Sequence, residues 1–314
     1  MESLGPKAKM EFFVDPEYRF KLKRINFGWR LELWSPWSDS FKAVINQYDI
    51  IEIGLSVLSG FSSKTLEFLS EFPSLESVEI LGGEYDPGPI LKIPSLKRIN
   101  LVFKPTAAMD FERLPGLEEA IVSWRPQLAS LLELTQLRSF RCSGLPSKHF
   151  GRIAEMKNLR ALYLSGSNTI RLKSLAGHER LEDLEFNKMI GIDDWDVLSS
   201  IHRLRKLHIH YSKSIRSIEF IQLLHKNFQD LCLFGCPHVR TLEPLRPIAS
   251  LRRLTVRGPK LETQFDLTIL LDKPNLEWVN LSGMRTVYRG MTSGALDISD
   301  RGTFGRLAVP VFNG

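Results

Sequence analysis

The chain has 314 residues, of which 43% are hydrophobic and 25% are charged, close to the averages of globular proteins. This composition excludes a disordered, collagen-like or fibrous chain and leaves enough apolar residues for a large core. The formal net charge is +6, but basic and acidic residues are interspersed. Because nucleic-acid binders gather their basic residues in one stripe or tail, we do not expect a nucleic-acid partner.

The sequence gives no sign of export or of membrane insertion. Its first 16 residues lack the apolar stretch that a secretory signal needs, and no window of about 18 residues is free of polar side chains. The three cysteines, Cys142, Cys232 and Cys236, are too few for a disulfide framework. We therefore expect a cytoplasmic protein that has no membrane partner.

The first 49 residues carry the signals of a hairpin and a short helix. Apolar residues alternate with polar ones between Arg19 and Trp34, around a turn at residues 26–28, which predicts two antiparallel strands. Ser35 or Ser38 can begin a helix that runs through Phe41. Three of the six tryptophans, at positions 29, 34 and 37, lie in this region. We interpret them as packing residues, with a partner surface as the alternative.

Residues 50–284 repeat one pattern, L-x-x-L-x-L, which is clear at 159–164, 181–186 and 204–209. In the residues before each copy, apolar side chains recur every third position, and within the copy they recur every second. The second part predicts a short strand and the first a 3₁₀-like return path. With other apolar residues allowed, the pattern starts 11 times, at intervals of 20 to 25 residues: at Ile50, Leu75, Leu96, Leu117, Leu137, Leu159, Leu181, Leu204, Phe228, Leu251 and Leu276.

This pattern resembles the leucine-rich repeat, whose period is 20–29 residues. The resemblance covers about three quarters of the chain. It implies an α/β solenoid, a horseshoe of about 11 coils with a parallel β-sheet on its concave face. The Asn or Cys that closes the motif is poorly kept, although Cys236 matches it, so we expect irregular coils. Because a solenoid must cover its terminal apolar faces, we interpret residues 1–49 and 285–314 as caps, the second with a strand at 307–312.

In leucine-rich repeats the third, fifth and seventh residues of each unit face the concave side. Exposed aromatic residues and arginine dominate the energetics of protein interfaces, and charges of both signs orient a partner. The alternative is an ordinary solvated sheet face, where aromatic residues are also common. We predict that the following residues of the C-terminal half bind a partner: Arg141, Tyr163, Asp183, Glu185, Lys206, His208, His210, Asp230, Phe234, Arg253, Arg257 and Trp278.

One group of these positions also has the residue types of a chemical site. His208 and Cys232 should be neighbours on adjacent strands, with His210 and Glu185 close by. Such a set can bind a transition metal or support a Cys–His nucleophile. The simpler interpretation is a polar patch, so we predict no metal site, no cofactor and no catalytic residue. The sequence also lacks a glycine-rich phosphate loop and the H-E-x-x-H and G-x-S-x-G motifs.

The resemblance implies a non-enzymatic module that recognises a protein partner. Within that class we favour an immunity protein, which neutralises a cognate toxin by occluding its active site. Arg141, Lys206, Arg253 and Arg257 would then face an acidic site of the toxin. The alternatives are the substrate receptor or adaptor of a ubiquitin ligase, which calls for a helical segment of about 40 residues ahead of the repeats, and a regulatory scaffold of another enzyme.

Overall fold

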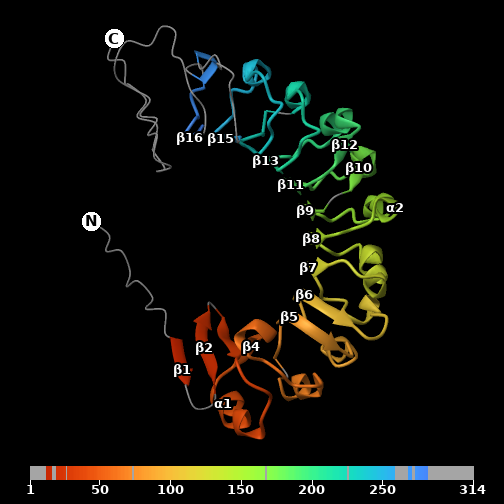
Figure 1. Cartoon of the computed structure of the whole chain (residues 1–314), viewed down its shortest axis with the longest axis vertical. Helices are drawn as coiled ribbons and strands as arrows, with labels where there is room; N and C mark the ends of the chain where they lie inside the picture. Colours follow the sequence, from red (N-terminus) through yellow and green to blue (C-terminus); the bar gives the residue numbers. More distant parts are fainter. Residues whose placement is uncertain are drawn as a thin grey trace, which may run out of the picture. The chain divides into compact units, whose positions relative to one another are not determined.

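The computed structural model describes residues 12–15, 19–25, 27–72, 74–166, 168–224, 226–258, 268–270 and 273–281. The chain divides into two compact units, Met1–Leu137 and Arg138–Gly314. Within each unit, short strands lie side by side, and 3₁₀ helices return the chain from one parallel strand to the next (Figure 1). Each strand with its return path is one coil of a solenoid.

The N-terminal unit begins with an antiparallel arrangement and continues with parallel strands. β1 pairs with β2 and β2 with β3, all antiparallel, and from β3 to β7 each strand pairs parallel to the next. The strands are β1 (Phe12–Asp15), β2 (Phe20–Ile25), β3 (Gly28–Leu33), β4 (Ile50–Ser56), β5 (Ser77–Tyr85), β6 (Arg98–Pro105) and β7 (Glu119–Ser123). The 3₁₀ helices are Asp39–Phe41, Val57–Ser59, Glu67–Glu71, Ile90–Lys92, Phe111–Arg113 and Pro126–Glu133, and helix α1 is Lys42–Gln47.

Two of the three tryptophans at the start of this unit, Trp29 and Trp37, pack against its own aromatic residues. Trp37 stacks on Phe68 with ring centroids 4.7 Å apart, and Trp29 meets Tyr48 edge-on at 4.9 Å. Ser38 precedes the 3₁₀ helix Asp39–Phe41 and accepts a hydrogen bond from the Ser40 amide, which satisfies one of the free N–H groups at a helix start. These contacts favour the packing interpretation for Trp29 and Trp37.

In the described part of the C-terminal unit, every strand pairing is parallel. Its main sheet has the order β8-β9-β11-β13-β14-β15-β16, and β10 pairs with β12 in a second, two-stranded sheet. The main strands are β8 (Ser139–Ser143), β9 (Ala161–Ser165), β11 (Asp183–Asn187), β13 (Lys206–His210), β14 (Asp230–Phe234), β15 (Arg253–Arg257) and β16 (Trp278–Asn280). The others are β10 (Thr169–Arg171), β12 (Gly191–Asp193), α2 (Ser147–Phe150) and the 3₁₀ helices Gly151–Glu155, Leu172–Leu175, Trp195–Ser200, Glu219–Leu223, Glu243–Leu245 and Thr268–Leu270.

The core of the C-terminal unit consists of rows of apolar side chains that run across the strands. The second residues of five successive strands are paired in register and are at most 1% exposed: Leu162, Leu184, Leu207, Leu231 and Leu254. The fourth residues, such as Phe186 and Ile209, form a second buried row. Burial at every second position therefore fixes which side chains of each strand are left on the other face.

Parts of the sequence-based prediction fall on residues that the structure does not describe. The proposed C-terminal cap at 285–314, with its strand at 307–312, lies outside the described residues. In the portion that is described, no helix combines the length and the apolar character needed to cross a lipid bilayer.

Candidate binding face of the C-terminal unit

The site lies on the side of the main sheet opposite the buried rows, which we call the open face. It is formed by the first, third and fifth residues of the strands β8 to β16. In β11, for example, Asp183, Glu185 and Asn187 are partly exposed, whereas Leu184 and Phe186 are buried. All the predicted partner-binding residues occupy such positions: Arg141, Tyr163, Asp183, Glu185, Lys206, His208, His210, Asp230, Phe234, Arg253, Arg257 and Trp278.

The first, third and fifth residues of the strands form the first, second and third rows of the open face. In the first row, the charges alternate from β11 to β15. In register, Asp183 lies beside Lys206, Lys206 beside Asp230, and Asp230 beside Arg253. The Lys206 ammonium donates a hydrogen bond to Asp183 Oδ2 at 2.9 Å, and this bond raises the pKa of Lys206. Because opposite charges are neighbours on adjacent strands, the row is internally compensated and presents both signs to a bound molecule.

The second row carries an arginine stacked on a tyrosine. The Arg141 guanidinium carbon lies 4.5 Å from the centroid of the Tyr163 ring, which is the distance of a cation–π contact. Burial raises the pKa of Tyr163, with the Asp183 carboxylate adding to the shift, so its hydroxyl stays protonated near neutral pH. The pair gives this part of the face an aromatic surface with a positive charge stacked on it.

The third row ends in an aromatic group around Phe234. The Arg257 guanidinium carbon lies 5.4 Å from the Phe234 ring centroid, and the Tyr211 ring meets Phe234 edge-on at 4.9 Å. Tyr211 follows β13 in the left-handed region, with φ of 53°, and its amide donates to the Phe234 carbonyl at 2.6 Å. Tyr211 is 52% exposed, so this aromatic group extends from the open face to its rim.

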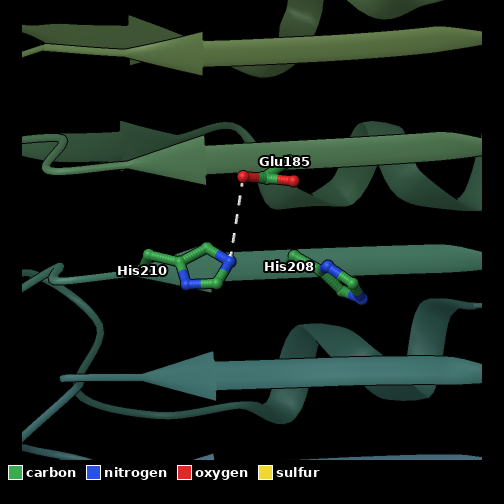
Figure 2. Close-up of side chains that lie close together, drawn as sticks. All are labelled: Glu185, His208 and His210. Carbon is green, nitrogen blue, oxygen red and sulfur yellow. Dashed lines mark ion pairs between the residues drawn. The ribbon is translucent and has the colours of Figure 1, made fainter. Parts of the chain in front are cut away.

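Two histidines and a glutamate converge in the middle of the open face. One ligand atom from each of Glu185, His208 and His210 lies within 4.8 Å of the other two (Figure 2). His210 Nε2 is 3.9 Å from Glu185 Oε1, and His208 Nε2 is 3.1 Å from Asp230 Oδ1. Burial lowers the pKa of His210, which favours its neutral imidazole near neutral pH.

Cys232 lies beside His208 in the register, as the sequence predicts, but it is a poor nucleophile. Burial raises its pKa to about 12, and the carboxylate of Asp230 adds to the shift. Since the thiolate is the reactive form of cysteine, a thiol with this pKa has little nucleophilic character near neutral pH. The raised pKa of the thiol therefore argues against a Cys–His catalytic pair, although the two residues are neighbours.

The predicted residues are not all close together. Arg141 on β8 and Trp278 on β16 are separated by six strand spacings, about 29 Å at about 4.8 Å each. The contacts described above lie between β8 and β15. Sequence reasoning left Asn187 out of the predicted set, although it faces the same side and pairs in register with His210. The Asn187 Oδ1 atom is buried and has no hydrogen-bond partner among the described residues.

Comparison with known proteins shows the fold. No family model matches the sequence, and no curated protein matches it. An internalin of Listeria monocytogenes is 15% identical and aligns over 82% of each chain, with a TM-score of 0.54. A leucine-rich repeat protein of Leptospira interrogans is 17% identical over 80% of this chain and 77% of its own, with a TM-score of 0.51. The Arabidopsis receptor kinase HAESA, solved with the peptide hormone IDA and the co-receptor SERK1, is 18% identical over 74% of this chain and 42% of its own, with a TM-score of 0.51.

Likeness at these identities concerns the fold alone. Together with the stacked parallel strands and the buried leucine rows, it confirms the prediction of a leucine-rich repeat solenoid. The partner and the activity of the chain have to be inferred from its own side chains, because one fold hosts many functions.

Proposed function

We propose that the chain is a non-enzymatic protein-recognition module and that a partner protein docks on the open face of its C-terminal unit. The observation that carries this proposal is the grouping of arginines on aromatic rings, Arg141 on Tyr163 and Arg257 on Phe234. Arginine and large aromatic residues supply most of the binding energy at protein interfaces. The complex of HAESA with a peptide hormone and a co-receptor is a case in which a chain of this fold binds such partners.

The size of the open face indicates how a partner would use it. Six strands of five residues and one of three, spaced about 4.8 Å apart with about 3.3 Å per residue, give a sheet of about 34 by 16 Å at its widest, or about 500 Å². A standard interface buries about 800 Å² on each partner. A stable partner must therefore also contact the turns that border the strands, where Tyr211 is the most prominent exposed aromatic residue.

The finer role that we propose is that of an immunity protein, which blocks the active site of a cognate toxin by covering it. Three arginines of the open face, which lack an acidic partner in the part of the chain that the structure describes, support an acidic target. Of the four basic residues in the predicted set, only Lys206 is paired with an acidic side chain among the described residues. Arg141, Arg253 and Arg257 are thus available to meet carboxylates of a partner, and such charge complementarity speeds association and rejects wrong partners.

The ubiquitin-ligase alternative depends on a helical segment ahead of the repeats. In the described part of residues 1–49, the structure has three strands and one α-helix of six residues, α1. These described residues do not form the long helical segment that this alternative calls for. A regulatory scaffold of another enzyme would use the same face, and the identity of the partner separates that role from immunity.

A pull-down from the native host, with the full chain as bait and mass spectrometry as readout, tests the proposal. We expect Phe234→Ala and Arg257→Ala to weaken capture of the partner by more than about fivefold, which corresponds to about 1 kcal/mol. The matched control is Arg216→Ala, which removes an exposed arginine outside the strands. A partner that binds wild type and both open-face variants equally would disprove the location.

The finer proposal has its own test. If the captured partner is a toxin, adding the chain at equal concentration should abolish its activity, and Arg257→Ala should restore part of it. A toxin that stays fully active while bound would contradict occlusion of its active site, although it would leave the recognition module in place.

A further inference from the structure

We propose that Glu185, His208 and His210 bind one divalent transition-metal ion, with Zn²⁺ as the first candidate. The fold brings these residues together for a simple reason. His208 and His210 are two residues apart on β13 and so point to the same face, and Glu185 on β11 pairs in register with His208. Figure 2 shows the three side chains on the same side of the two neighbouring strands.

The distances between the ligand atoms are close to those of a metal site. Zinc binds imidazole nitrogen and carboxylate oxygen at about 2.0–2.2 Å, so two ligand atoms of a tetrahedral site are about 3.4 Å apart. In this cluster His210 Nε2 and Glu185 Oε1 are 3.9 Å apart, and no pair of the three ligand atoms is separated by more than 4.8 Å. Side-chain rotations that bring the atoms about 0.5 to 1.4 Å closer complete the geometry without moving the strands.

The surroundings of the cluster resemble the supporting contacts of metal-bound histidines. Such a histidine usually donates its second ring N–H to a carboxylate, which fixes its orientation and tautomer. His208 Nε2 lies 3.1 Å from Asp230 Oδ1, which leaves His208 Nδ1 as the atom available to an ion. The buried Oδ1 of Asn187, which pairs in register with His210, has no hydrogen-bond partner among the described residues, and a water or ion bound beside His210 would satisfy it.

The donor set selects the class of ion. Ca²⁺ and Mg²⁺ require six or more ligands dominated by oxygen, which two imidazoles and one carboxylate do not supply. Imidazole favours Zn²⁺, Cu²⁺ and Ni²⁺. Three protein ligands leave one tetrahedral position open for water or for a donor atom of a bound molecule. The site needs no partner protein to form, so its existence is independent of the proposed recognition function.

Titration of the chain with Zn²⁺ tests the proposal directly. The full chain, freed of any polyhistidine tag and stripped with EDTA, is titrated in a calorimeter. We expect one ion per chain with a dissociation constant in the micromolar range or tighter. Glu185→Gln, His208→Gln and His210→Gln should each weaken binding by at least about tenfold, because each removes a ligand. The matched control His238→Gln removes an exposed histidine outside the cluster and should leave the affinity unchanged.

A spectroscopic measurement separates coordination from loose binding. Co²⁺ in place of Zn²⁺ should give the intense visible absorption of a four-coordinate site in wild type and lose it in His208→Gln and His210→Gln. Asp230→Asn keeps all three ligands and should lower the Zn²⁺ affinity by about 10- to 100-fold while the circular dichroism stays that of wild type. Absence of saturable binding at one ion per chain, or an equal loss of affinity in His238→Gln, would overturn the proposal.

Discussion

Substitution of Leu207 by alanine should destabilise the protein strongly, because this side chain is at the centre of a buried row. Leu207 is 0% exposed, and its neighbours in register, Leu184 and Leu231, are 1% and 0% exposed. Removing three carbon atoms loses about 2.4 kcal/mol of transfer free energy at about 0.8 kcal/mol each. A residual cavity of about 60 Å³ adds about 1.4 kcal/mol at about 24 cal/mol per Å³, for a total of about 4 kcal/mol.

The adjacent residue is a matched control for this prediction. Lys206 precedes Leu207 on β13, its side chain is 48% exposed, and its main contact is the ion pair with Asp183. Exposed ion pairs contribute about 0–1 kcal/mol, so Lys206→Ala should unfold at nearly the wild-type denaturant concentration. Both variants are measured by urea unfolding followed by far-ultraviolet circular dichroism. If Lys206→Ala were the damaging change and Leu207→Ala the silent one, the register of β13 would be wrong by one residue.

Three further predictions concern backbone strain, thiol reactivity and pH. Gly60 has φ of 107°, and a Cβ there would lie 2.5 Å from the Trp34 carbonyl oxygen, so Gly60→Ala should lower the free energy of unfolding by more than about 1 kcal/mol. The control Gly151→Ala, at φ of −56° and with open space around the new Cβ, should not lower it. Equal stability of the two variants would refute this prediction. Burial raises the pKa of the Cys142, Cys232 and Cys236 thiols to about 11 or about 12. Ellman's reagent at pH 8 should therefore modify the folded chain far more slowly than the chain unfolded in urea. Equal rates of modification would contradict the burial of the thiols. Burial lowers the pKa of His178 below its usual 6.5, so the folded state favours the neutral ring and the free energy of unfolding should fall as the pH drops below 6.5. The melting temperature of His178→Gln should therefore drop less than that of wild type between about pH 7.5 and pH 5. An equal drop in both proteins would exclude this histidine as a cause.

The sequence is sufficient to predict the strands of the main sheet of the C-terminal unit and the face that their side chains occupy. The pattern that begins at Leu204 predicts a strand in which Leu207 and Ile209 point inward, and both are buried in β13. This prediction succeeds because a strand has a side-chain period of two, so a single buried leucine fixes the orientation of its neighbours. Parallel stacking of coils of similar length then places equivalent positions side by side.

The contacts within the open face could not be predicted in the same way. Register places His208 between Glu185 and Cys232, but the rotamers decide that His208 bonds to Asp230 and that His210 approaches Glu185. The sequence also gave no signal for the short β10–β12 pairing, because strands of three residues carry too few alternations to be distinguished from turns. The sequence does not single out Asn187, because only the folded chain shows that its buried amide oxygen lacks a partner among the described residues.

The stacking of equivalent positions into rows also bears on how such a chain can change over evolutionary time. Every coil donates one side chain to each row, so a substitution at an outward position alters one spot of the surface and leaves the inward leucines untouched. Binding preference can consequently drift one strand at a time, while folding depends on a different set of residues. Duplication or loss of a whole coil would lengthen or shorten every row at once, which offers a direct route to partners of another size.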